Sequence, residues 1–152
     1  MNPRTTTRRS FLFGSLLTMK GAEYLTSSLA PTNDGSTMYI GRQKGYQVQI
    51  IIKFLPDGSV PRYDATITAQ RTGTVLALLK SADFDPVTRT DFASNATLNG
   101  RALLTGIGDV EGSFNVFVNG ALFQDLGIAE KLATPGQQVR VVALTGARIV
   151  GK

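Results

Sequence analysis

The chain has 152 residues, of which 42% are hydrophobic and only 18% are charged, and its formal net charge is +5. A chain of this length is expected to form about one domain around a single core. It contains no Cys and no His, which excludes disulfides, thiolate nucleophiles, Cys-ligated metals and histidine-activated nucleophiles within the chain. We therefore expect a non-enzymatic protein with no catalytic residues, no cofactor and no metal ion.

The positive charge is concentrated near the N-terminus. Residues 1–45 hold six basic and two acidic side chains, whereas residues 46–152 hold ten basic and nine acidic side chains. We interpret the first segment as an N-terminal arm and linker and the second as a β domain. A basic arm on a nearly neutral body favours contact with nucleic acid or with an acidic protein surface.

The arm contains the segment Arg-Arg-Ser-Phe-Leu at residues 8–12, which resembles a twin-arginine export signal. The apolar stretch behind it is short for a secretory signal, because Lys20 and Glu23 interrupt it. The apolar spacing over residues 10–29 predicts a short amphipathic helix instead. We expect an uncleaved arm that docks on the body or on a neighbour, through Arg4, Arg8, Arg9, Phe11, Phe13, Leu16, Leu17 and Tyr24. Export to the periplasm or the extracellular space is the alternative, and no stretch approaches the roughly 20 apolar residues of a membrane span.

From Tyr46 onward the apolar residues recur with a period of two, which is typical of strands. Residues 46–54 form the strongest predicted strand, and a turn around Pro56 and Gly58 leads into a second strand at residues 63–70. Residues 74–80 are apolar throughout and fit either a buried strand or a turn of helix; we predict a strand.

Residues 81–97 read as a long polar connection. Asn119 and Gly120 fit a two-residue type I′ hairpin turn, and residues 134–136 form another turn. The remaining predicted strands are residues 97–107, 114–118, 121–128, 138–144 and 147–150. About seven short strands predict an all-β fold, a mainly antiparallel sandwich or barrel with an extended or short-helical basic N-terminal arm.

Two loops are candidate ligand sites. The glycine-rich segment 106–112 lacks the spacing of a dinucleotide fingerprint and the Lys-Ser/Thr pair of a P-loop, so we predict a turn between strands. Asp83, Asp85 and Asp91 offer oxygen ligands, but their loop lacks the Gly and Glu of an EF-hand. We predict a loop ordered by Asx turns, with a metal site as the alternative.

Two functional hypotheses follow. Apolar residues on the polar faces of the predicted strands (Ile51, Leu55 and Phe117) indicate that the second face is partly covered by another layer or subunit. The leading hypothesis is a virion subunit, a bacteriophage capsid protein or a capsid-decorating protein, that forms homo-oligomers and stabilises the shell by arm and β-domain contacts. Its expected partners are other copies of itself and a major capsid protein, and its expected location is the virion. The alternative is a single-stranded nucleic-acid-binding β-barrel, for which the candidate aromatics are Tyr39, Tyr46, Phe54 and Tyr63.

Overall fold

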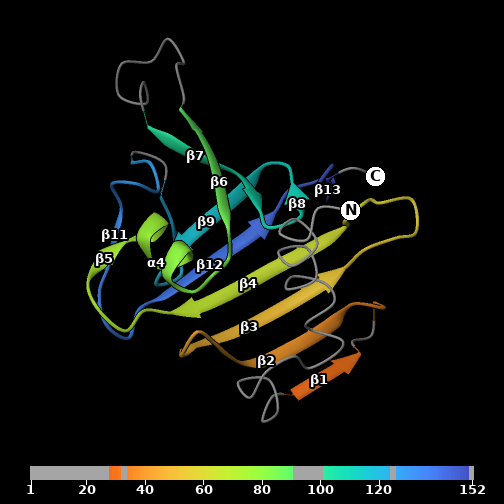
Figure 1. Cartoon of the computed structure of the whole chain (residues 1–152), viewed down its shortest axis with the longest axis horizontal. Helices are drawn as coiled ribbons and strands as arrows, with labels where there is room; N and C mark the ends of the chain where they lie inside the picture. Colours follow the sequence, from red (N-terminus) through yellow and green to blue (C-terminus); the bar gives the residue numbers. More distant parts are fainter. Residues whose placement is uncertain (1–27, 32–33, 91–100, 124–125, 151–152) are drawn as a thin grey trace, which may run out of the picture.

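The structure is a computed structural model that describes residues 28–31, 34–90, 101–123 and 126–150. This part of the chain is mostly β-sheet, its strands pair antiparallel, and it contains one short helix (Figure 1). The all-β, antiparallel prediction is therefore confirmed. The residues of the predicted N-terminal contact set lie outside the described residues.

The largest element is a seven-stranded sheet. Its strands, in spatial order, are β1 (Ser28–Pro31), β2 (Thr37–Gln43), β3 (Tyr46–Lys53), β4 (Arg62–Thr68), β12 (Gln138–Ala143), β9 (Phe114–Val118) and β10 (Ala121–Leu122). The strands predicted at residues 46–54, 63–70, 114–118 and 138–144 are confirmed as β3, β4, β9 and β12. The predicted type I′ turn joins β9 and β10, since Asn119 and Gly120 have φ values of 53° and 85°.

The sheet also includes residues that the sequence placed in the arm and linker. β2 pairs with β3 over seven residue pairs, and β1 pairs with β2 over four. Tyr39 and Gln43 of β2 are buried, with exposures of 0% and 1%. The β body therefore begins at least as early as Ser28, before the boundary at residue 46.

Alternation along the strands creates the core. On β3, Val48, Ile50 and Ile52 point inward and are buried, whereas Gln47 and Gln49 point outward and are exposed, as expected for a strand with one buried face. The inward residues of β4, β9 and β12 continue the same apolar layer. Burying each of these side chains contributes roughly 1.5–3 kcal/mol.

The strand predicted at residues 74–80 is wrong, because this segment is the helix α4 (Val75–Ser81). Thr74 is its N-cap, and the Thr74 hydroxyl accepts a hydrogen bond of 3.1 Å from the backbone N–H of Ala77, which satisfies one of the unpaired donors of the first turn. Val75, Leu78 and Leu79 follow the helical i, i+3, i+4 spacing and are buried. An apolar run without alternation fits a buried strand and a helix alike, and here the Thr74 cap and the buried face of Val75, Leu78 and Leu79 stabilise the helix.

Two smaller sheets and α4 lie on one face of the large sheet (Figure 1). The four-stranded sheet has the order β13 (Arg148–Ile149), β8 (Val110–Glu111), β7 (Ala102–Ile107) and β6 (Pro86–Thr90). The two-stranded sheet joins β5 (Gly73–Thr74) to β11 (Leu132–Ala133). Their inward apolar side chains join those of the large sheet in one core.

The structure corrects two further strand predictions. The polar connection predicted at residues 81–97 contains β6, which was missed because its side chains are mostly exposed and show no apolar alternation. The strand predicted at residues 121–128 is limited to the two residues of β10. The predicted extended segment 97–107 corresponds to β7 from Ala102 onward, and the predicted strand at residues 147–150 corresponds to β13.

Candidate interaction surfaces

One candidate surface is the face of the large sheet that points away from the core, here called the outer face. Its side chains alternate with the buried ones and are half-buried or exposed. Large apolar side chains lie toward both edges of this face, with Ile40 on β2 43% exposed and Leu122 on β10 41% exposed. The outer face comprises Met38, Ile40, Arg42, Gln47, Gln49, Ile51, Lys53, Arg62, Asp64, Thr66, Thr68, Asn115, Phe117, Leu122, Gln138, Arg140 and Val142.

The strand register aligns part of this face in one row across six strands. The row runs Ile40, Gln49, Thr66, Arg140, Phe117 and Leu122. Since neighbouring strands lie about 4.8 Å apart, the row is about 24 Å long. Its two ends are apolar and its centre is polar. Beside its β2 end lies a shallow hollow of about 530 Å³ walled mainly by Gln and Thr side chains and by Arg42.

Arg140 is held firmly at the centre of the outer face. Its Nε and Nη2 donate to the two carboxylate oxygens of Asp64 at 2.9 Å and 2.6 Å, and its guanidinium lies 5.6 Å from the centre of the Phe117 ring. The hydrogen bonds that Arg140 donates to Asp64 raise the pKa of Arg140. Such a bidentate pair fixes the guanidinium in position, and half of the Arg140 side chain remains exposed.

The second acidic residue at this face is also paired. The Asp34 carboxylate accepts a hydrogen bond of 2.9 Å from Nη1 of Arg62, and the Asp34 carbonyl accepts one of 2.7 Å from Nζ of Lys53. Arg42 donates through Nη1 to the carbonyl of Gly45 at 2.8 Å. Four basic residues and two acidic residues therefore lie at the outer face, which gives its described part a small positive charge. They are Arg42, Lys53, Arg62 and Arg140, with Asp34 and Asp64.

The aromatic residues proposed for base stacking do not form a surface platform. Tyr39, Tyr46 and Tyr63 point into the core and are buried, and Phe54 alone of the four is exposed. Burial raises the pKa of Tyr63, whose ring packs edge-on against Phe114 at 6.3 Å. The Tyr63 hydroxyl has no hydrogen-bond partner in the described part of the chain. The alternating tyrosines of these strands are therefore core residues and not a base-stacking surface.

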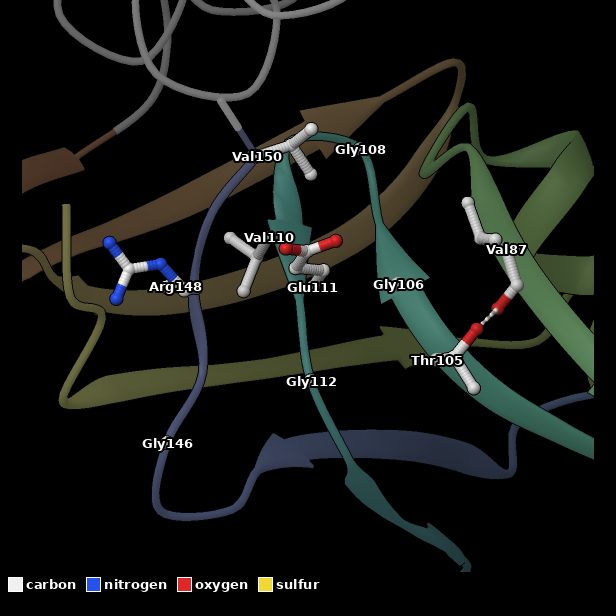
Figure 2. A pocket seen from close by; sticks show the side chains of 10 residues that line it. All are labelled: Val87, Thr105, Gly106, Gly108, Val110, Glu111, Gly112, Gly146, Arg148 and Val150. Atoms are coloured by element: carbon white, nitrogen blue, oxygen red, sulfur yellow. Dashed lines mark hydrogen bonds between the residues drawn. The ribbon is translucent and has the colours of Figure 1, made fainter. Parts of the chain in front are cut away.

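A second candidate surface is a trough on the four-stranded sheet, shown in Figure 2. Its volume is about 550 Å³. The register places Val87, Gly106, Glu111 and Arg148 in one row across β6, β7, β8 and β13. Gly106 packs closely beneath Val87, since an added Cβ would lie only 3.1 Å from the Cβ of Val87.

A β-bulge shapes one side of this trough. The register between β6 and β7 shifts after Val87, so that Thr105 has no opposite residue. The Thr105 hydroxyl donates to the Val87 carbonyl at 3.3 Å (Figure 2). Bulges of this kind re-aim neighbouring side chains, and Val87 is left 46% exposed at the rim.

Glu111 is exposed in the trough and has no side-chain partner among the described residues. Arg148 lies opposite Glu111 in the register, but Figure 2 shows the two charged ends pointing apart. Nη2 of Arg148 donates to the carbonyl of Asp57 at 3.4 Å. The carboxylates of Asp34, Asp57, Asp64 and Glu130, in contrast, accept hydrogen bonds.

The two candidate ligand loops lie at turns in the structure. Within the segment 106–112, Gly108 and Asp109 form the turn between β7 and β8, so the prediction of a turn between strands is confirmed. Asp83 and Asp85 have φ values of 63° and 49°, which Asp tolerates better than most residues. Asp91 lies outside the described residues, and the described residues contain no group of three or more potential metal-ligating side chains.

The structure links the loop near Asp83 to the core through Gln43. The buried Gln43 side chain donates from Nε2 to the carbonyls of Ala82 and Asp83 at 2.7 Å and 3.2 Å. No helix in the described ranges is long and apolar enough to cross a membrane. Comparison of the chain with protein-family models, with curated proteins and with solved structures finds no match.

Proposed function

We propose that this chain is a non-enzymatic assembly subunit that builds or decorates a virion shell. The observation that carries the proposal is the outer face, a broad strand surface with apolar ends on which no described helix or strand packs. The row of about 24 Å, combined with strands that average about six residues at about 3.3 Å per residue, spans about 480 Å², somewhat more than half of the roughly 800 Å² that each partner contributes to a standard interface.

The chemistry of this face also suits a protein interface. Protein interfaces are enriched in aromatic residues, Met and Arg, and the outer face carries Phe117, Met38 and Arg140. Because Asp64 and Phe117 already hold Arg140 in place, little side-chain entropy is lost when a partner contacts it. A rigid Arg next to an aromatic ring has the character of an interaction hot spot.

The basic N-terminal segment supplies a second means of contact in this proposal. Arg4, Arg8 and Arg9 precede the first acidic residue, Glu23. Such a segment is suited to an acidic neighbour or to packaged nucleic acid. The proposed partners are other copies of this chain and a major capsid protein.

The decisive experiment is the native mass of the full-length chain measured by sedimentation velocity over a wide range of concentrations. We expect association that rises with concentration. Arg140→Ala should weaken it roughly tenfold or more if Arg140 is a hot spot, whereas Asp57→Asn, on a loop away from the outer face, should leave it unchanged. A chain that stays monomeric at every concentration would contradict the proposal.

An exported β protein is a second candidate, favoured by the twin-arginine-like segment 8–12 and by the position of β1. The first described strand begins at Ser28, so the residues before it match the length of a signal peptide. Mass spectrometry of the native protein separates the two candidates. A mature start shortly before Ser28 supports export, whereas retention of the arginines contradicts it. A start near residue 31 would also remove β1 from the sheet.

A further inference from the structure

We propose that a pocket between α4 and the ends of β3 and β4 binds the C-terminal residue of a peptide, a free carboxylate that carries a small branched apolar side chain. This inference goes beyond the proposed function, because the pocket is separate from the outer face and its ligand need not be a copy of this chain. The pocket has two adjoining parts, here called the apolar slot and the basic hollow.

The apolar slot has a volume of about 100 Å³ and lies where small side chains leave space. Ala77 on α4, Ala133 on β11 and Ala69 beyond β4 line it, together with Tyr46 and Leu78. A dry cavity of about 150 Å³ is large enough to hold benzene. The smaller slot therefore suits a group of roughly three or four carbons, such as the side chain of a valine or a leucine.

The basic hollow adjoins the slot, because Tyr46, Arg71 and Ser81 line both spaces. Its volume is about 520 Å³, its other lining residues are Lys44 and Gln70, and no carboxylate of the described residues lines either space. Arg71 is exposed, and its guanidinium has no hydrogen-bond or ion-pair partner in the structure described. A guanidinium holds a carboxylate through two parallel hydrogen bonds, so Arg71 is the residue that would bind the carboxylate of the ligand.

Hydrogen bonds from two glutamines hold the walls of the pocket in place. Nε2 of Gln70 donates to the carbonyl of Gly45 at 2.6 Å, which ties the segment before Arg71 to the turn between β2 and β3. Nε2 of the buried Gln43 donates to the carbonyl of Ala82 at 2.7 Å, which ties the end of α4 to β2. A pocket whose walls are already fixed loses little conformational entropy when a ligand binds.

The end of α4 beside the pocket is compatible with an anion. The C-terminal end of a helix carries partial negative charge on its unpaired carbonyls, which disfavours an anion nearby. Here the carbonyls of Leu78, Leu79 and Lys80 accept hydrogen bonds of 2.9 to 3.0 Å from backbone N–H groups that follow the helix. Their pairing reduces the repulsion that a carboxylate at Arg71 would experience.

The size of the basic hollow favours a peptide over a free acid. The hollow is about five times as large as the slot, so a carboxylate fills a small part of it and the rest leaves room for the preceding residues of a peptide. The hydroxyl of Ser81 and the side-chain carbonyl of Gln70 offer hydrogen bonds to the backbone of such a chain. Capture of a C-terminal carboxylate is a recurring mode of peptide recognition.

The first test is an NMR titration of the isotope-labelled full-length protein with the peptide acetyl-Ala-Ala-Ala-Val. The backbone resonances of Arg71 and Ala77 should shift. The same peptide with a C-terminal amide should bind about 10-fold more weakly or worse, because it lacks the charged partner for Arg71. A peptide that ends in glycine should also bind about 10-fold more weakly, because it leaves the apolar slot empty.

The second test assigns each part of the ligand to its part of the pocket. Arg71→Gln should weaken binding of the valine peptide about 10-fold or more, whereas Arg89→Gln, which removes the same charge from an exposed arginine on β6, should leave it unchanged. Ala77→Leu places a larger side chain at the slot, at an exposed helix position where leucine is well tolerated. This variant should lose the preference for valine over glycine. Thermal unfolding checks that each variant is folded.

Several outcomes would overturn the proposal. Equal binding of the acid and the amide would exclude recognition of the carboxylate, and an unchanged preference in Ala77→Leu would exclude the slot. Isovalerate carries the same two groups without a peptide chain, so binding as tight as that of the peptide would contradict the peptide assignment. Resonances that do not move at about 10 mM peptide, well above a Kd of about 1 mM, would contradict the site itself. Self-association of the chain, which tests the proposed function, is a separate measurement from these titrations.

Discussion

The two faces of the large sheet are built from the same strands but use different chemistry. On the inner face, Ile50, Ile67 and Val139 are buried in one continuous core, and the most conspicuous polar exception is the hydroxyl of Tyr63. On the outer face, apolar residues at the ends flank a pair of charged side chains, Arg140 and Asp64. The first face holds the buried core, and the second is the surface on which we propose that a partner packs.

The two faces should differ most in how much stability the protein loses when an isoleucine is shortened to alanine. Ile67→Ala on the inner face should lower the free energy of unfolding by about 2–5 kcal/mol, because it leaves a cavity in a fully buried layer. Ile40→Ala on the outer face should change it by less than about 0.5 kcal/mol. Urea denaturation of both variants measures this, and equal losses would show that the outer face is covered within the chain.

The buried hydroxyls provide a comparison within the inner face. Tyr63→Phe should stabilise the protein by about 1 kcal/mol, because it removes a buried hydroxyl without a partner. Tyr39→Phe is the matched control, since the Tyr39 hydroxyl donates to the carbonyl of Arg42 at 3.3 Å, and its loss should be destabilising. Thermal unfolding shows whether each variant is more or less stable than the wild type. A less stable Tyr63→Phe variant would indicate that the Tyr63 hydroxyl has a hydrogen-bond partner.

The ion pair on the outer face should contribute less to folding than to binding. A double-mutant cycle with Arg140→Ala and Asp64→Ala should give a coupling of about 1 kcal/mol or less in unfolding, because half of the Arg140 side chain is exposed. The coupling should shrink as salt is added. A large, salt-independent coupling would instead assign this pair to the stability of the fold.

The smallest expected effect concerns Asp57, in the turn between β3 and β4. The Ser59 hydroxyl and backbone N–H donate to its carboxylate at 2.6 Å and 2.9 Å and hold the pKa of Asp57 below its ordinary value of 3.8. Because the pKa of Asp57 is lower in the folded state than in the unfolded state, ionised Asp57 stabilises the fold. This stabilisation is complete above the ordinary pKa and is lost as the pH falls through the lower pKa of the folded state. In an NMR pH titration, Ser59→Ala should raise the pKa of Asp57; an unchanged pKa contradicts this cause.

Much of the sheet could be predicted because alternation is a local property of the sequence. In β3 and β4 every second residue is apolar, so one face is specified before the chain folds. The segment at residues 74–80 could not be assigned in this way, since its apolar residues suit either a strand or a helix; the helix is stabilised by the cap at Thr74 and by burial of its apolar face in the core. β6 was missed because its exposed residues carry no apolar signal.

The sequence by itself determined the antiparallel β class, the turn at Asn119 and Gly120, and the apolar side chains of the core, because each depends on neighbours in the chain. Only the tertiary structure decided the surfaces. Val87, Gly106, Glu111 and Arg148 are adjacent because four strands pair in one register, and the same kind of pairing aligns Ile40 with Leu122 across six strands. Strand register depends on contacts between segments distant in sequence, and no local pattern encodes it.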